Sequence, residues 1–365
     1  MKVLLNSYDL GTILSSPPVI TDQLNAVCRV LEIEVASSYA LDNFLGQVIQ
    51  LYYGTERWFI GILRKRLSYS DKTIRYAAYD PLYFFKKNPD DWYFRNQTAT
   101  QAIEVMADAS GIRISNLANT GVVFSNLYYP GKDPDVVAVD LLARTYQQSE
   151  DKYWFRYNPS ENNEGLQLFK REVPREIWVF QTNVNLISAS YEQSIEDTIN
   201  IVKYVNRDTG KVVIRKDDAS IKRYGPTKLF EEIDKDNVGN MENLAAAKLE
   251  ELNKIKTTMK VEGINPNAVM PQFYSGDVIY VEERFTGLVG AYHILNVVQT
   301  FEGDNLIKLE FDIQAAPDIP AIKVDDATET PEQKQHNTNI YNASDTGKGV
   351  QQLYSNEVES VIESY

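Results

Sequence analysis

Side chains that could act as nucleophiles or metal ligands are few in this sequence. It has one cysteine, Cys28, and two histidines, His293 and His336. A zinc site needs several Cys or His residues at short spacings, and neither histidine has such a neighbour. A nucleophile pair would have to join Cys28 with His293 from distant parts of the chain, and nothing in the sequence supports it. We expect Cys28 to be a small buried hydrophobic residue within a strand, and we predict no metal and no cofactor.

Adjacent carboxylates are the other groups that could do chemistry. A glycosidase needs two carboxylates about 5–10 Å apart across a cleft. With 51 acidic residues, neighbouring acids arise by chance, and adjacent residues of a strand point to opposite faces. We therefore interpret four such pairs as solvated surface groups: Asp90-Asp91, Asp217-Asp218, Glu231-Glu232 and Glu282-Glu283. No nucleophile-elbow, P-loop or dinucleotide-binding motif is present, so we predict no catalytic residue and no enzymatic activity.

The charge balance limits the classes of partner. Against 51 acidic residues stand 37 basic ones, which gives a net charge of −14. Proteins that bind nucleic acids neutralise phosphates with clustered Lys and Arg, so specific nucleic-acid binding is not expected. The first residues do not form a signal peptide, and no apolar run approaches about 18 residues. These features predict a protein made in the cytoplasm that does not insert into membranes.

Five basic residues stand out against this acidic background. Arg64, Lys65 and Arg66 are consecutive, and Lys86 and Lys87 follow further along the chain. Exposed strand ends would explain them equally well. As a candidate interaction surface, they would dock onto an acidic neighbouring protein.

Residues 74–111 give the clearest prediction of local secondary structure. Asp80 before Pro81 predicts a capped short helix after a strand, because proline at the first helical position needs no amide proton. Thr98 and Gln101 have the spacing of a capping box, and Gly111 is placed to end the second helix in a left-handed conformation. The stretch therefore predicts strand, short helix, strand and long helix.

The flanking regions have the two-residue period of β-strands. Leu31, Ile33 and Val35 alternate with acidic residues near the N-terminus, and residues 306–313 alternate strictly near the other end. Two further helices are predicted, one in the mixed middle of the chain and one within the second β-rich region. One is predicted at about residues 136–147, with Val139, Leu142 and Tyr146 as its buried spine, and the other at about residues 240–256.

Residues 74–111 are also where the chain resembles a known family. The runs AAYDPLYFFKKN, FRNQTATQAI and ASGI resemble the baseplate hub proteins of contractile tails. These include the phage late control protein D group and the related hubs of prophages, bacteriocins and type VI-like injection machines. The resemblance extends over about residues 1–314 and is strong again at residues 275–311. Its motifs are structural and contain no catalytic signature.

Pattern and resemblance together predict a mainly β fold with an α+β middle. Periodicity alone gives two β-rich modules around a mixed region, and the resemblance implies that both are tube-type β-barrels. The expected divisions are a first barrel module at residues 1–73, a mixed α/β region at 74–175, and a second barrel module at 176–317 with the inserted helix 240–256. A polar C-terminal tail at 318–365 cannot bury enough apolar surface to order itself alone.

The resemblance implies a structural role in assembly. Three copies would form a homotrimeric ring whose six barrel modules surround a channel. One face would match the six-fold tail tube and the other the three-fold central spike, with further baseplate components around them. The protein would be made in the bacterial cytoplasm and end in the baseplate of a phage or phage-tail-like particle.

Two other functions remain open at this point. A tail-associated enzyme that degrades the cell wall would need an acid pair in a cleft. A glycan-binding tail protein would need aromatic residues on an open face, and the candidates are Trp92, Tyr93, Trp154 and Trp178. Core or interface packing explains these aromatic residues better.

Overall fold

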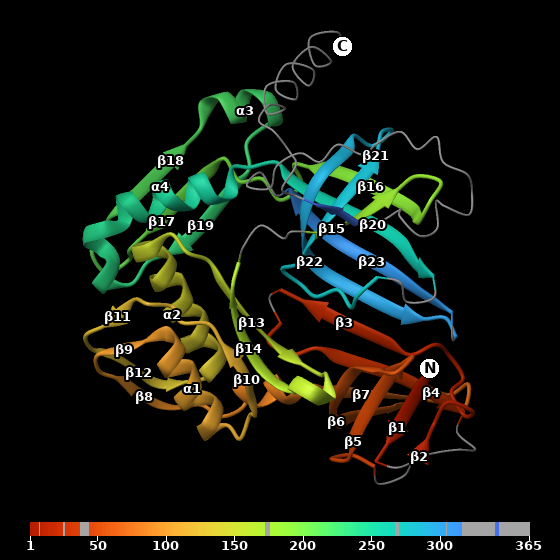
Figure 1. Ribbon diagram of the computed structural model, residues 1–365. Helices are drawn as coiled ribbons and strands as arrows, with labels where there is room; N and C mark the ends of the chain where they lie inside the picture. Colours follow the sequence, from red (N-terminus) through yellow and green to blue (C-terminus); the bar gives the residue numbers. More distant parts are fainter. Residues whose placement is uncertain are drawn as a thin grey trace. The chain divides into compact units, whose positions relative to one another are not determined.

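The computed structural model describes most of the chain. The described residues are 1–6, 8–24, 26–36, 44–171, 176–266, 270–303, 305–315 and 340–342. They divide into two compact units, a larger one made of Met1–Ala189 with Lys260–Tyr365 and a smaller one, Ser190–Met259. β-Strands predominate, with helices gathered in the middle of the chain and in the smaller unit (Figure 1). Apart from residues 340–342, the predicted tail at 318–365 lies outside the described residues.

The N-terminal β region is an antiparallel sheet in which the predicted alternation is confirmed. Leu31, Ile33 and Val35 are all buried. Its strands are β1 (Lys2–Leu5), β2 (Tyr8–Asp9), β3 (Val19–Gln23), β4 (Val30–Ala36), β5 (Val48–Tyr53), β6 (Glu56–Ser68) and β7 (Thr73–Tyr79), in the spatial order β3-β4-β7-β6-β5-β1-β2.

The segment after β2 links the two ends of this region. The Leu10 N–H donates to the Val3 carbonyl of β1 at 2.7 Å, and the Ser15 N–H donates to the Glu34 carbonyl of β4 at 2.8 Å. The sheet therefore curls. β7 pairs with both β4 and β6, whereas the predicted division at residues 73/74 falls at the start of this strand. The four-part division of the chain stays a prediction.

The middle of the chain follows the predicted order of strand, short helix, strand and long helix. Its elements are η2 (Pro81–Lys86), β8 (Asp90–Phe94), β9 (Gln97–Thr98), α1 (Ala99–Ala109), β10 (Ile114–Leu117), β11 (Val123–Phe124), β12 (Leu127–Lys132), α2 (Pro134–Ser149), β13 (Tyr153–Asn158), η3 (Glu161–Asn163) and β14 (Gly165–Lys170). The Asp80 carboxylate accepts the Leu82 N–H at 3.0 Å. Thr98 and Gln101 form the capping box, and Gly111 has a φ of 67°. The short helix is of the 3₁₀ type.

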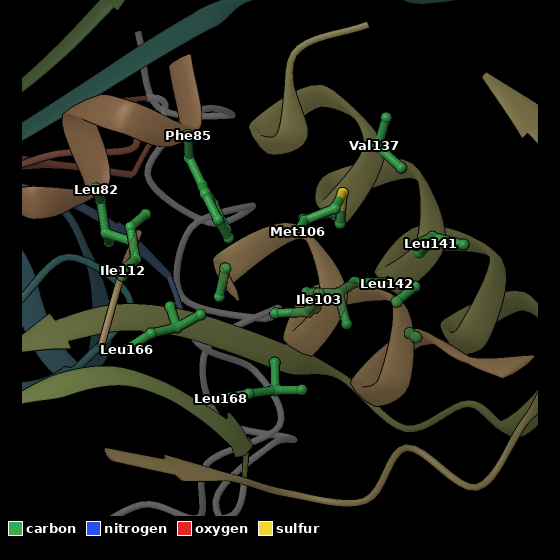
Figure 2. Close-up of a cluster of buried hydrophobic side chains, with 14 of the residues drawn as sticks. Leu82, Phe85, Ile103, Met106, Ile112, Val137, Leu141, Leu142, Leu166 and Leu168 are labelled. Carbon is green, nitrogen blue, oxygen red and sulfur yellow. The ribbon is translucent and has the colours of Figure 1, made fainter. Parts of the chain in front are cut away.

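A hydrophobic cluster holds the middle region together (Figure 2). Ile103 and Met106 of α1 belong to it with Leu141 of α2 and Leu166 of β14, and all four are fully buried. The predicted spine of α2 was wrong in part. Its buried face carries Val137, Ala138, Leu141, Leu142 and Thr145, whereas Val139 is 57% and Tyr146 44% exposed. The helix has apolar residues on two adjoining faces, and the face packed on α1 is not the predicted one.

The second β region has its own aromatic core. The ring centroids of Phe180, Phe273 and Phe311 lie 5.1–5.9 Å apart. Gly263 packs against this core, and a Cβ there would lie 2.5 Å from the Phe180 ring, so the close approach requires glycine. The strands are β15 (Glu176–Gln181), β16 (Leu186–Ser194), β20 (Lys256–Pro266), β21 (Val278–Glu283), β22 (Leu288–Phe301), β23 (Leu306–Ala315) and β24 (Ile340–Asn342).

The smaller unit is an α/β insertion between β16 and β20. It comprises β17 (Ile201–Val205), β18 (Val212–Lys216), α3 (Asp218–Tyr224), β19 (Lys228–Glu232), η4 (Lys235–Asn240) and α4 (Met241–Leu252). Met241 and Ala245 of α4 pack on Val202, Tyr204 and Val213 of the sheet. The predicted helix at 240–256 exists but is shorter, because the backbone leaves helical geometry at Asn253 (ψ 59°) and residue 256 already starts β20.

The two β regions are joined by direct strand pairing. β3 pairs antiparallel with the C-terminal half of β22, from Gln23 opposite Asn296 to Val19 opposite Thr300. Both regions therefore belong to one 14-stranded sheet. The mainly β fold with a mixed middle is confirmed. Among the described residues the strand path is open, and neither region closes into a barrel by pairing alone.

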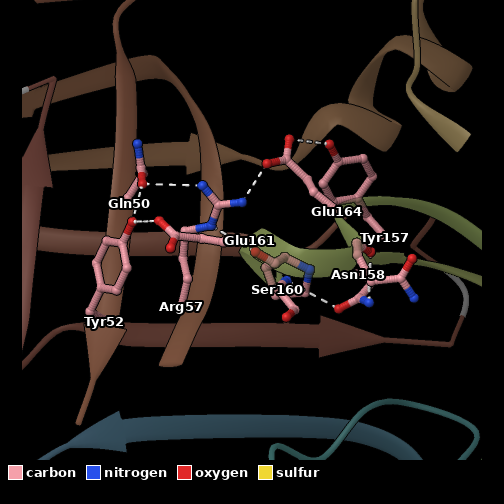
Figure 3. A network of polar contacts seen from close by, with 10 residues as sticks. Gln50, Tyr52, Arg57, Tyr157, Asn158, Ser160, Glu161 and Glu164 are labelled. Atoms are coloured by element: carbon pink, nitrogen blue, oxygen red, sulfur yellow. Dashed lines mark hydrogen bonds and ion pairs between the residues drawn. The ribbon is translucent and has the colours of Figure 1, made fainter. Parts of the chain in front are cut away.

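A polar network fixes the N-terminal sheet to the middle region (Figure 3). The Arg57 side chain of β6 forms an ion pair with Glu164, and its Nε donates to the Pro159 carbonyl at 2.7 Å. The Tyr157 hydroxyl donates to the same Glu164 carboxylate at 2.8 Å. Beside it, the Tyr52 hydroxyl donates to Glu161. Because the Arg57 side chain is only 6% exposed, little water can replace these partners.

Replacing Arg57 should be costly because it leaves Glu164 without its cation. We expect Arg57→Met to lower the free energy of unfolding by roughly 3–5 kcal/mol. The matched control is Arg75→Met, whose ion pair with Glu34 is 44% exposed on the arginine side and should contribute about 1 kcal/mol or less. Urea denaturation of both variants measures the difference, and equal losses would contradict a buried network.

Candidate functional site

The structure places the two groups of predicted basic residues on β6 and η2, two elements that are linked by a contact of Arg64. Arg64, Lys65 and Arg66 lie in the second half of β6, and Lys86 and Lys87 lie at the end of η2. All five are exposed. The Arg64 guanidinium lies over the rings of Tyr83 (4.5 Å) and Phe84 (5.0 Å), which belong to η2. We call these five residues the basic patch.

A β-bulge positions Arg64. The pairing of β6 with β7 shifts register between Leu63 and Lys65, so Arg64 has no direct partner on β7. Its side chain instead rests on the aromatic residues of η2, a cation–π contact that restrains a long side chain. The basic patch is therefore ordered at Arg64.

The buried carboxylate of Asp80 positions the start of η2. Asp80 is 3% exposed, and its two oxygens accept the N–H groups of Leu82 and Arg29, each at 3.0 Å. Burial raises the pKa of Asp80 to about 7, although both hydrogen bonds and the Arg29 charge act in the opposite direction. The same carboxylate thus caps η2 and anchors the segment that leads into β4.

A second buried carboxylate lies where β3 meets the second β region. Asp22 accepts the N–H of Ser275 at 3.1 Å and its hydroxyl at 3.0 Å. Burial raises the pKa of Asp22 against the opposing effect of Arg29. Arg29 in turn stacks on Tyr274 at 4.7 Å and donates to the Trp58 carbonyl. This cluster joins three parts of the larger unit.

Asp22 and Asp80 line one cavity and have raised pKa values, which are features of acid catalysts. Their oxygens, however, are occupied: those of Asp80 accept two backbone N–H groups, and those of Asp22 accept both donors of Ser275. A carboxyl group held in this way positions the backbone. The arrangement favours a structural role over general acid catalysis.

The other groups considered for chemistry have structural partners too. Cys28 is buried, as predicted, but lies in a bend before β4 rather than in a strand, and burial raises the pKa of its thiol to about 12. His293 lies in β22 and contacts Arg171, while His336 is outside the described residues. Within the described ranges, no three or more His, Cys, Asp or Glu side chains are arranged to hold a metal ion.

The adjacent carboxylates are surface groups in two cases and turn or cap formers in the others. Asp90-Asp91 and Glu231-Glu232 are exposed. Asp217 accepts the N–H groups of Ala219 and Ser220 and so caps α3. Glu283 accepts the N–H groups of Phe285 and Thr286 in the turn after β21. Only the first two pairs match the simple prediction of solvated surface.

The aromatic residues proposed for sugar stacking do not share one open face. Trp92 is 7% exposed, and its indole N–H donates to the Lys132 carbonyl at 2.8 Å. Tyr93 is exposed on β8, whereas Trp154 of β13 and Trp178 of β15 are half-buried. Trp92 is thus a core residue, as the packing interpretation predicts.

Sequence reasoning missed two exposed aromatic features. Phe285, at the tip of the β21–β22 turn, is 96% exposed. Tyr93 and Tyr128 stand directly opposite each other on β8 and β12, and each is nearly 60% exposed. For Phe285, the available signal in the sequence was an apolar residue between charged residues and Gly287. Exposed aromatic side chains are favoured at protein–protein contacts.

Every helix among the described residues is too short or too polar to cross a membrane.

Comparisons with known proteins agree with the expected fold. A family model described as YQBQ-like matches residues 19–312. The phage-like element PBSX protein XkdQ of Bacillus subtilis is 26% identical over 262 residues, which cover 71% of this chain and 78% of that protein. The crystal structure of a 43 kDa tail protein from prophage MuSo2 of Shewanella oneidensis matches with a TM-score of 0.54 and 14% identity, over 85% of this chain and 96% of that one.

A further structural match is the c3393 protein of E. coli, described as a component of the type VI secretion system with similarity to the T4 bacteriophage tail proteins gp27 and gp5. Its TM-score is 0.51 at 13% identity, over 87% of this chain and 77% of that one. The predicted resemblance to phage tail proteins is confirmed in sequence family and in fold.

The raised pKa of Asp80 predicts a pH dependence of stability. Because the folded state holds this proton up to about pH 7 and the unfolded chain loses it near pH 4, the contribution of Asp80 to stability falls as pH rises between these values. In the limit the fall is on the order of 4 kcal/mol. We expect Asp80→Asn to be less stable than the wild type but to lose less stability between pH 4.5 and 7.5.

Urea denaturation across that range measures the difference, with exposed Asp108→Asn as the control. Comparing each variant with the wild type removes the contributions of other carboxylates. Identical pH profiles for the wild type and Asp80→Asn would contradict the raised pKa.

Proposed function

Because this chain belongs to the YQBQ-like family and has the fold of phage tail proteins, we propose that it is a structural component of a phage-type tail, namely the baseplate hub. In this role it forms a homotrimeric ring that joins the six-fold tail tube to the three-fold central spike of a contractile tail or phage-tail-like particle. It is made in the bacterial cytoplasm and then remains in the baseplate.

One observation supports the hub above all others. The β3–β22 pairing fuses two β regions of a single chain into one sheet. One protomer therefore carries two β modules side by side, and three protomers carry six. Such a chain can face a six-fold partner with its modules and a three-fold partner with its protomers.

The exposed features supply candidate contacts for this assembly. The basic patch suits an acidic neighbouring protein, because complementary charge guides and orients docking. Phe285 and the pair of Tyr93 with Tyr128 suit apolar contacts, because aromatic anchors contribute most to protein–protein binding. We assign these surfaces to contacts with the tube, the spike, other baseplate components or the neighbouring protomer.

A structural role also suits the carboxylates. The buried ones accept backbone donors, and half of the adjacent pairs shape a turn or cap a helix. The proposal therefore includes no turnover. A cell-wall-degrading or glycan-binding tail protein is the alternative, and peptidoglycan turnover or glycan binding by the purified chain would favour it.

The first test is native mass spectrometry of the chain, alone and co-expressed with the products of neighbouring genes, followed by electron microscopy of any oligomer. The expected result is a trimer, or a ring with a central channel and three-fold or quasi-six-fold symmetry. A stable monomer that gains no partner under either condition would contradict the proposed ring.

The basic patch can be tested by charge reversal. We expect the double variant Arg64→Glu and Arg66→Glu to lose association with its acidic partner by at least tenfold, because two favourable charges become repulsive. The matched control is Arg215→Glu with Lys216→Glu, a basic pair of the smaller unit that already binds Glu242 and Asp218. Unchanged co-purification by the first variant, with an unchanged melting temperature, would exclude the patch as a docking surface.

A further inference from the structure

The three-stranded sheet of the smaller unit has one face that α4 covers and one that it does not. Val202 and Tyr204 of β17 and Val213 of β18 belong to the cluster under α4. Successive residues of a strand point to opposite faces, so the residues that alternate with these lie on the other side, which we call the uncovered face. It is formed by Ile201, Lys203, Val205, Val212, Ile214, Lys216, Lys228, Phe230 and Glu232.

The uncovered face carries apolar side chains where a sheet that faces water normally carries polar ones. Val212, Ile214 and Phe230 are 50%, 53% and 53% exposed. Ile201 and Val205, on the middle strand between them, are half-buried. A contiguous group of exposed apolar side chains marks a surface that binds another molecule.

A lysine occupies the centre of the uncovered face. β17 is the middle strand, and its Lys203 lies opposite Ile214 of β18 on one side and opposite Phe230 of β19 on the other. Ile201 and Val205 flank it along its own strand. The Lys203 ammonium lies 5.6 Å from the centre of the Phe230 ring, and this cation–π contact holds the charge over the apolar residues.

The remaining charges of the uncovered face are balanced, with one exception. Lys216 binds Asp218 at 2.7 Å, and Glu232 binds Arg207 at 2.9 Å. Lys228, like the central lysine, forms no ion pair within the part of the chain that the structure describes. The uncovered face therefore has a net positive charge at its centre and along the edge formed by β19.

The central charge decides which kind of partner fits. Covering the Lys203 ammonium with apolar groups alone would remove its hydration without compensation, which is strongly unfavourable, whereas a carboxylate on the partner compensates the loss. A second copy of the same face, packed about a two-fold axis through its centre, would bring Lys203 against Lys203. Single-stranded nucleic acid stacks its bases on several aromatic side chains, and of the residues that form the uncovered face, all of them described, only Phe230 is aromatic.

We propose that the uncovered face of the smaller unit binds a partner protein that presents an aspartate or glutamate flanked by apolar side chains. The carboxylate lies on Lys203, and the apolar groups lie on Ile214 and Phe230. The charge pair then fixes the position of the partner, and the apolar contacts provide most of the binding free energy. This inference does not rest on the hub assignment, because it uses only the exposure and charge of the smaller unit.

Carbodiimide cross-linking tests the contact, because the reagent joins an amine to a carboxylate that touches it. The full-length chain is co-expressed with the products of neighbouring genes, purified together with the proteins that bind it, cross-linked and digested for mass spectrometry. The ion pair of Lys256 with Asp197, 3.0 Å apart in the same unit, is the internal control for coupling. We expect Lys203 to be coupled to a carboxylate of another protein, in a sequence with apolar residues on both sides of it.

The cross-linked products separate the other possible occupants. A dimer in which Lys203 is coupled to a carboxylate of this same sequence means that a second copy covers the face, and coupling within a monomer means that the chain itself does. Either product overturns the proposal, as does coupling of Lys256 to Asp197 without any product of Lys203. Binding of a fluorescent oligothymidine that is lost in Lys203→Glu would assign the face to nucleic acid and would overturn it too.

Charge exchange gives a second measurement. We expect Lys203→Glu to weaken binding of the cross-linked partner at least tenfold, and replacement of the partner's coupled carboxylate by lysine to restore binding to this variant. The matched control is Lys248→Glu, because Lys248 is also half-buried but belongs to α4, which packs on the opposite side of the sheet. Equal losses in the two variants at unchanged melting temperature, or no restoration by the partner's lysine, would contradict the contact.

Discussion

The pairing of β3 with β22 is the constraint on which the rest of the larger unit depends. It joins residues 19–23 to residues 296–300, so the two β regions cannot move as independent bodies. Its register is fixed by more than main-chain hydrogen bonds, because Asp22 on β3 accepts both donors of Ser275. A shift by one residue would turn Asp22 to the other face and leave those donors unpaired. Tyr53, Trp58 and Phe301 complete the junction with ring centroids 5.6–5.8 Å apart.

Buried charges extend this constraint into the middle region. Arg29 and Asp80 are both nearly inaccessible, and burying such groups costs several kcal/mol each unless they are well paired. Asp80 recovers part of this cost by accepting two backbone N–H groups. In doing so it fixes the start of η2, and η2 carries the aromatic rings on which Arg64 rests. The position of an exposed cation is thus determined by a carboxylate that water does not reach.

The sequence predicted best those features that depend on neighbouring residues. Asp80-Pro81 and Thr98 with Gln101 specified helix starts because capping involves residues only two or three positions apart. The strand alternation at Leu31 to Val35 was equally local. The β3–β22 pairing could not be predicted, because nothing in either strand specifies a partner more than 270 residues away. The prediction of the buried face of α2 was wrong in part for the same reason. The helix has two adjoining apolar faces, and only packing on α1 selects between them.

The same distinction applies to the candidate site. Arg64, Lys65, Arg66, Lys86 and Lys87 were recognisable as charges, but the contact of Arg64 with the aromatic rings of η2 depends on a bulge and a 3₁₀ helix. Phe285 gave almost no signal, because a single apolar residue in a turn is common. Sequence patterns therefore identify the charges and the capping residues, whereas the contacts around them depend on which strands and helices pack together.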